Sequence, residues 1–311
     1  MNHSIQKKIT APILSGVSKM GNLIYPSRNE SPVLISGSPR GGTTWIAEAV
    51  AETFSSKRML WEPLQEGNIH KSHINFSKRP FVSDNNITGE QRIFFNKLLN
   101  AEFANAHTVR LRESYFNLFR LLSSDKLIIK FVRGNGVVGW LAKEYKIPKP
   151  VIIVRHPCAV ISSQLKMGSW EDHPHIDSAL YNINEKFIKY NDRNMELHKR
   201  LAVTWAADVT AAIYNKRNVH IVFYEDIVLN SGGEFREVFS DWGSEELFEK
   251  FKLISLKSSS TSHSWSDHSS VKSKIESWKS RLNQKVINDV LNIVDDLGVT
   301  LYGTDGLPRE S

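Results

Sequence analysis

The sequence predicts an α/β fold with three layers, in which helices cover both faces of a central, mostly parallel sheet. The strand-like segments Val33–Ser36 and Val151–Val154 are apolar without polar alternation, which is typical of strands buried on both faces. Helical patterns lie between the strand-like segments, and strands that alternate with helices form parallel sheets. The 311 residues suffice for one large domain of this kind.

Each element has its own pattern. The apolar residues of Gln91–Ala106 recur at helical spacing, whereas short runs bounded by polar residues predict strands. The expected strands are Val33–Ser36, Arg58–Trp61, Lys126–Phe131, Val151–Val154 and Val219–Phe223. The expected helices are Thr43–Thr53, Gln91–Ala106, Val137–Tyr145, Pro157–Gln164, Asn184–Asn215 and Lys285–Leu297.

The predicted domain spans residues 31–311, after an N-terminal extension of residues 1–30. The apolar run Ala11–Val17 is broken by Ser15 and Gly16, and no clear cleavage site follows it. This pattern favours a loosely packed extension over a cleaved signal peptide. No apolar run is long enough to predict a transmembrane segment.

Composition limits the partners and the compartment. Lysine and arginine number 40 against 33 acidic residues, and this excess favours anionic ligands such as nucleotides. No long basic block and no nucleic-acid-binding motif is present, so nucleic acid is not an expected partner. The single cysteine, Cys158, excludes an intramolecular disulfide and a metal site built on cysteines. A cytoplasmic location suits this cysteine usage.

The segment after the first strand is the most informative part of the chain. A loop from Gly37 to Gly42 joins this strand to a helix, the arrangement in which backbone N–H groups hold phosphate at a helix N-terminus. The spacing Gly-x-x-x-x-Gly is typical of P-loop-type α/β domains, but Thr43-Thr44 replaces the usual Lys-Ser/Thr. The loop carries Arg40 instead, which favours a phosphate ligand other than a nucleoside triphosphate.

A second anion-binding pair follows the fourth expected strand. Arg155 stands at the carboxyl end of this strand, where ligands bind in open α/β sheets, and Ser163 follows eight positions later. A guanidinium and a hydroxyl of this kind can bind one phosphate together. Two anion sites without an evident metal carboxylate indicate a nucleotide with two separated phosphate groups and no metal.

These two motifs resemble those of sulfotransferases that use 3′-phosphoadenosine-5′-phosphosulfate (PAPS). The family's 5′-phosphosulfate loop is similar to Pro39-Arg40-Gly41-Gly42-Thr43-Thr44, with Gly41 in place of the common serine, and its 3′-phosphate pair is similar to Arg155 and Ser163. The resemblance covers about residues 32–302. The chain resembles the carbohydrate and tyrosylprotein branches more than the phenol and steroid branch. The segment Lys130-Phe131-Val132-Arg133 lacks the catalytic histidine of the phenol and steroid branch.

The resemblance implies a role for each site residue. Arg40 would stabilise the leaving 5′-phosphate with help from Lys130, and Glu62, 22 residues after Arg40, would be the general base. Trp45 would stack on adenine. Further cofactor contacts would come from Tyr224 and from Lys272, Ser273 and Lys274 in a late loop.

Other interpretations of the same residues stay open. Arg40 or Arg155 could be an ordinary salt-bridge partner. Glu62 could belong to a structural ion pair, and Lys130 could be a solvated residue at the end of a strand. Trp45 and Tyr224 could be packed aromatics. The serine-rich stretch Ser255–Lys274 is either a linker or a flap over the site.

The expected function is sulfuryl transfer from PAPS to a hydroxyl of a glycan, a glycolipid or a small metabolite. A P-loop kinase or NTPase is the alternative, although Thr43 stands where its lysine should be. A nucleic-acid-binding module is a third, non-enzymatic alternative. Neither the acceptor nor the oligomeric state is encoded in a pattern that we recognise.

Overall fold

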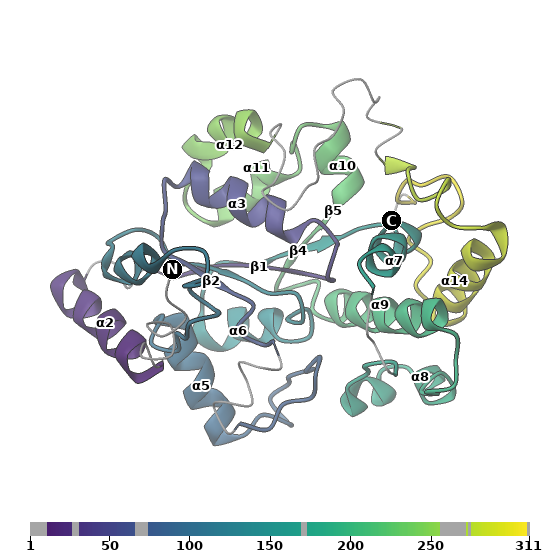
Figure 1. Cartoon of the computed structure of the whole chain (residues 1–311), viewed down its shortest axis with the longest axis horizontal. Helices are drawn as coiled ribbons and strands as arrows, with labels where there is room; N and C mark the ends of the chain where they lie inside the picture. The colour runs from purple at the N-terminus through teal and green to yellow at the C-terminus, as the bar shows by residue number, and fades with distance from the viewer. Residues whose placement is uncertain are drawn as a thin grey trace.

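The computed structural model describes residues 11–26, 31–65, 74–168, 173–255, 272 and 275–309. These residues form a five-stranded parallel sheet in the order β2-β3-β1-β4-β5. Helices lie on both faces of the sheet (Figure 1), which confirms the three-layer α/β fold. The strands are β1 (Val33–Gly37), β2 (Met59–Trp61), β3 (Ile128–Lys130), β4 (Val151–Val154) and β5 (His220–Phe223).

Alternate residues of each strand enter two separate cores. Val33 and Ile35 of β1 pack in one apolar cluster, while Leu34 between them belongs to the other. This division follows from the two-residue period of a strand. Both faces are apolar, so the buried strands lack the polar alternation of a half-exposed sheet.

The helices divide between these two cores. On one face lie α3 (Thr43–Thr53), α11 (Phe235–Asp241) and α12 (Phe248–Ser255), which Figure 1 shows above the sheet. The other core contains residues of α5 (Gly89–Leu99), α6 (Val138–Tyr145), α7 (Pro157–Lys166), α9 (Leu197–Tyr214) and α14 (Gln284–Asp296). Shorter elements are η3 (Tyr115–Leu122), η4 (Ser178–Asn182), α8 (Lys186–Lys189), α10 (Tyr224–Leu229) and η5 (Glu245–Leu247).

The chain leaves β1 and β4 toward opposite faces of the sheet. β1 continues into α3, whose Ile46 and Val50 pack in one core, whereas β4 continues into α7, whose Val160 and Ile161 pack in the other. These strands are neighbours in the sheet. Open α/β sheets bind ligands in a crevice at the carboxyl ends of two such strands, and we call this place the crevice between β1 and β4.

Two predicted helices are shorter than expected. The helix expected over 184–215 is divided into the one-turn helix α8 and the long helix α9. The side chains of Asn184 and Asp192 accept hydrogen bonds from the backbone N–H groups of Lys186 and Asn194, and such local bonds compete with a helix. The helix expected over 91–106 ends at Leu99, because Ala101 adopts a left-handed conformation with φ 57°.

Residues 11–24 form a regular helix, α2 (Ala11–Ile24). Leu14 and Ser18 of this helix are fully buried, and Asn22 Nδ2 donates a hydrogen bond to the Asn100 carbonyl at 3.3 Å. The expectation of a loosely packed extension is therefore wrong for this helix. The division between residues 1–30 and 31–311 stays a prediction.

Candidate functional site

The loop after β1 turns sharply to start α3. The Gly41 N–H donates to the Ser38 carbonyl at 2.9 Å, and Gly42 has a φ of 97°, a conformation that favours glycine. Gly42 offers no side chain to cap α3, and the first bond of the helix is donated by Ile46 to the Gly42 carbonyl. The N–H groups of Thr43 and Thr44 thus have no acceptor within the helix and are suited to an anion.

Arg40, Arg155 and Ser163 meet at the crevice between β1 and β4. Arg40 Nε donates a hydrogen bond to Ser163 Oγ at 2.9 Å. Arg155 Nη1 donates to the Arg40 carbonyl at 3.3 Å. The structure therefore brings the two anion-binding motifs of the sequence, the loop and the Arg155–Ser163 pair, into direct contact.

Two aromatic side chains border this cation pair. The Arg155 guanidinium lies 4.1 Å from the ring centroid of Tyr224, and Trp45 meets the same ring edge-to-face at 5.6 Å. A Cβ atom on Gly42 would lie only 2.6 Å from Tyr224 Cδ2. The absence of a side chain at Gly42 is therefore what allows Tyr224 to lie against the loop.

The two guanidinium groups raise each other's electrostatic energy. Burial lowers the pKa of Arg40 from its usual value, and repulsion by the charge of Arg155 lowers it further. Arginine stays protonated in proteins. A bound anion between the two groups would relieve this repulsion, so the pair favours anionic ligands.

A second polar group lies at the ends of β2 and β3. Glu62, directly after β2, forms an ion pair with Lys130, the last residue of β3, and the Lys130 side chain is almost completely buried. The Glu62 N–H also donates to the Lys130 carbonyl at 2.8 Å. The Arg110 guanidinium lies 3.4 Å from the ring centroid of Trp61. Glu62 and Lys130 thus stand at the same edge of the sheet as Arg40, because parallel strands end together.

Comparison with protein families identifies the chain. The model of the sulfotransferase family matches residues 32–245, a range that contains β1 to β5 and both anion-binding motifs. The chain belongs to the sulfotransferase family. No curated protein matches the chain closely enough to serve as a relative.

The loop of this sulfotransferase rests on a buried network that the sequence did not reveal. Ser38 Oγ donates to Asp208 Oδ2 at 2.8 Å, and Arg79 Nη1 pairs with the same oxygen at 2.6 Å. Asn135 Nδ2 donates to the Asp208 carbonyl at 3.2 Å, and Ser36 Oγ donates to Asn135 Oδ1 at 2.7 Å. The signal in the sequence was Asp208, a charged residue among the apolar residues of α9.

The start of α7 is fixed by His156. Its Nδ1 accepts from the Cys158 N–H at 3.1 Å, so the proton lies on Nε2, which donates to the Gly303 carbonyl at 2.8 Å. Glu225 accepts from the His156 N–H and from the Tyr302 hydroxyl. Burial lowers the pKa of His156 to about 4 and raises that of the Cys158 thiol to about 12. These contacts hold His156 in place, and His156 in turn positions the neighbouring residue Arg155.

The late-loop residues are only partly described. Lys272 is exposed, and its carbonyl accepts from the Glu276 N–H at 3.0 Å. Beyond it, Trp278 is buried and stacks on His156 with ring centroids 4.5 Å apart. Ser273, Lys274 and most of the stretch Ser255–Lys274 lie outside the described residues, so their predicted contacts stay predictions.

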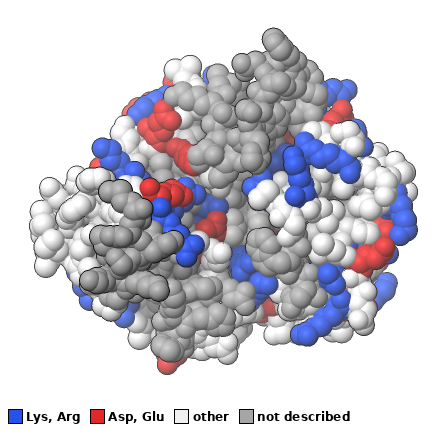
Figure 2. Space-filling view, in the orientation of Figure 1, with Lys and Arg blue, Asp and Glu red and all other residues white. Residues whose placement is uncertain are grey.

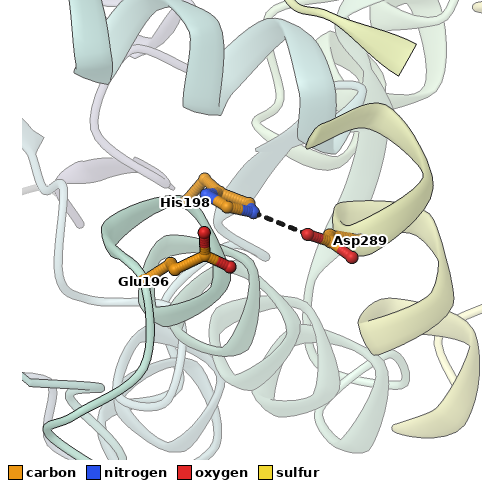
Figure 3. Close-up of side chains that lie close together, drawn as sticks. All are labelled: Glu196, His198 and Asp289. Atoms are coloured by element: carbon orange, nitrogen blue, oxygen red, sulfur yellow. Dashed lines mark hydrogen bonds and ion pairs between the residues drawn. The ribbon is translucent and has the colours of Figure 1, made fainter. Parts of the chain in front are cut away.

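A cluster that resembles a metal site lies between α9 and α14 (Figure 3). Glu196, His198 and Asp289 place one ligand atom each within 4.8 Å of one another, and His198 Nε2 lies 3.0 Å from Asp289 Oδ2. Lys199 forms ion pairs with Glu196 at 2.8 Å and with Asp289 at 3.5 Å, and Lys285 contacts the same two carboxylates. Two ammonium groups balance the two carboxylates, so the cluster fits an ion-pair network that joins the helices.

Within the described part of the chain, no helix combines the length and the apolar character that crossing a bilayer requires.

Proposed function

We propose that this sulfotransferase transfers the sulfuryl group of PAPS to a hydroxyl of its acceptor. The observation that carries the proposal is the meeting of Arg40, Arg155 and Ser163 beside the first turn of α3. PAPS carries a 5′-phosphosulfate and a 3′-phosphate on one adenosine. Two guanidinium groups and the start of a helix, gathered at one crevice, fit a ligand with two anionic ends.

Each part of the site takes one part of the donor. Arg40 and the residues from Gly41 to Thr44 bind the 5′-phosphosulfate, because the helix start supplies N–H donors and the loop supplies the cation. Arg155 and Ser163 bind the 3′-phosphate. Trp45 and Tyr224 offer apolar faces beside these cations and contact the adenosine, and Lys272, Ser273 and Lys274 complete the cofactor contacts.

The transfer needs charge stabilisation and a proton acceptor. The acceptor oxygen forms a bond to sulfur, the bond from sulfur to the 5′-phosphate oxygen breaks, and adenosine 3′,5′-bisphosphate (PAP) leaves. Arg40 and Lys130 stabilise the negative charge that builds on the leaving oxygen. Glu62 accepts the proton of the hydroxyl. Its ion pair with Lys130 supports the role by fixing the position of the carboxylate at the edge where the strands end.

The proposed acceptor is a glycan, a glycolipid or a small hydroxylated metabolite, and the proposed location is the cytoplasm. A single cysteine suits a reducing compartment. The P-loop kinase alternative is not favoured, since Thr43 stands where a kinase loop carries its lysine.

The decisive assay supplies PAPS and a panel of hydroxylated acceptors in excess chelator, beside a parallel reaction with ATP and Mg²⁺. We expect PAP and a sulfated product in the presence of chelator, because no step of the proposed reaction uses a metal. Phosphorylated product from ATP, with no transfer from PAPS to any acceptor, would overturn the proposal.

A further inference from the structure

An exposed apolar surface covers α2 and η3, which pack against each other. We call this area the α2–η3 surface. Leu23 is 81% exposed and Phe116 is 77% exposed. The other large apolar residues exposed on it are Ile13, Met20, Ile24, Tyr25, Tyr115 and Phe119. Isolated exposed apolar residues are ordinary, but a group of this size on two adjacent elements marks an interaction surface.

The packing of α2 explains why these residues face outward. Leu14, Ser18 and Gly21 recur at helical spacing and are buried against the domain. Ile13, Met20 and Ile24 occupy other positions around the helix and stay exposed. The helix therefore has apolar residues on the side away from the core, and its packing against the described residues does not require them there.

The charged residues within α2 and η3 are both basic. Lys19 is the only charged residue of α2, and Arg120 is the only charged residue of η3. In the segment just before η3, Arg112 and Glu113 are both exposed, one charge of each sign. In Figure 2 the far left of the view is mostly white, with Lys and Arg in places along its border.

We propose that the α2–η3 surface docks on a membrane that contains anionic lipids. Aromatic and aliphatic side chains beside lysine and arginine, without acidic residues in either element, are the composition of interfacial membrane-binding segments. The apolar side chains enter the boundary between headgroups and acyl chains, while the cations contact lipid phosphates. The proposal is independent of the sulfuryl transfer proposed above, because no residue of this surface belongs to the candidate site.

Co-sedimentation of the full chain with phospholipid vesicles tests this surface. We expect binding to phosphatidylcholine vesicles that contain phosphatidylglycerol, and much weaker binding to phosphatidylcholine alone. Leu23→Ser and Phe116→Ser should each weaken binding to the anionic vesicles about tenfold, since each removes a large apolar side chain from the interface. Arg120→Ala should weaken it about fivefold, as expected for one cation near a charged membrane surface.

Leu253→Ser is the matched control. Leu253 is 71% exposed on α12, which lies far from α2 in Figure 1, so this substitution should leave vesicle binding unchanged. All four variants should keep the thermal midpoint and the PAP affinity of the parent protein.

Three results would overturn the proposal. The first is no binding to anionic vesicles, and the second is equal weakening by Leu253→Ser and Leu23→Ser. The third is a protein that does not bind vesicles but self-associates with increasing concentration, where Leu23→Ser abolishes the self-association. That last result would assign the surface to a second copy of the chain.

Discussion

Arg40 Nε donates a hydrogen bond to Ser163 Oγ at 2.9 Å, and so joins the loop after β1 to helix α7 across 123 positions of the sequence. Gln164 Nε2 adds a second bond from α7 to the loop, at 2.9 Å to the Pro39 carbonyl. The two walls of the crevice between β1 and β4 are thus tied together. The geometry of one predicted anion-binding motif therefore depends on the other.

Substitution of Arg40 tests its part in the transfer. Arg40→Ala should lower kcat by about 10²–10³-fold, the usual effect of removing one donor to a developing negative charge. Arg40→Lys should recover part of this loss, because it keeps the charge but not the planar donor group. The control Arg236→Ala removes an exposed arginine of α11 that pairs with Glu249 of α12 and should leave kcat unchanged. Steady-state kinetics with PAPS measure all three, and a normal kcat in Arg40→Ala would remove Arg40 from the reaction.

Glu62→Gln tests the proposed base. The amide keeps a hydrogen bond to Lys130 but cannot accept the proton, so kcat should fall about 10²–10⁴-fold while PAP affinity stays the same. Calorimetry with PAP and initial rates with PAPS separate these two effects.

The matched control for the base is Glu113→Gln, which removes the charge from a carboxylate paired with Arg110 and should leave kcat unchanged. If Glu62→Gln keeps its kcat but loses free energy of unfolding, Glu62 is only the structural partner of Lys130.

A methyl group on Gly42 tests the contact between the loop and Tyr224. Gly42→Ala combines an unfavourable φ with a Cβ placed 2.6 Å from the tyrosine ring. Gly168→Ala is the control, since Gly168 has a φ of 69° and open space around its Cβ position. We expect Gly168→Ala to cost about 1 kcal/mol of unfolding free energy, and Gly42→Ala about 1–3 kcal/mol more. Only Gly42→Ala should weaken PAP binding, because Tyr224 also packs on Arg155; equal effects of the two variants in urea titrations would show that the contact is unimportant.

His156 should make the stability of the protein depend on pH. Burial lowers its pKa from 6.5 to about 4, so between these values the unfolded chain binds more protons than the folded one. Stability should therefore be fully present above pH 6.5 and fall as the pH drops toward 4, by up to roughly 3 kcal/mol from this residue.

His156→Asn isolates that contribution, because asparagine can still accept the Cys158 N–H bond. Urea titrations at several pH values should give a smaller loss toward low pH in the variant than in the parent protein. Glu225, whose pKa is raised by burial, is present in both proteins, so its own pH dependence largely cancels in the comparison. Parallel curves for the two proteins would mean that His156 titrates normally.

Local patterns in the sequence predicted most of the fold. The apolar run Val151–Val154 forms a strand with the predicted bounds, and Thr43–Thr53 forms a helix with the predicted bounds. One error fell where polar side chains bond to nearby backbone, at Asn184 and Asp192. Such local bonds change element boundaries without changing the hydrophobic pattern.

The supports of the site were beyond sequence reasoning. The bond from Ser38 to Asp208 spans 170 positions, and Arg79 reaches Asp208 across 129. A single sequence carries no signal for partners so far apart, because they meet only after the sheet has brought α9 beneath the loop. The contact between Arg40 and Ser163 is of the same kind: each residue could be predicted, but not the bond between them.

Calorimetric binding of PAP and of ATP, to the parent protein and to Arg155→Ala, tests the central claim most directly. PAP should bind more tightly than ATP, and Arg155→Ala should weaken PAP about a hundredfold, since hydrogen bonds to charged groups contribute ~1.5–3 kcal/mol each. ATP that binds as tightly as PAP, or PAP affinity that survives in Arg155→Ala, would contradict a site built for a donor with two anionic ends.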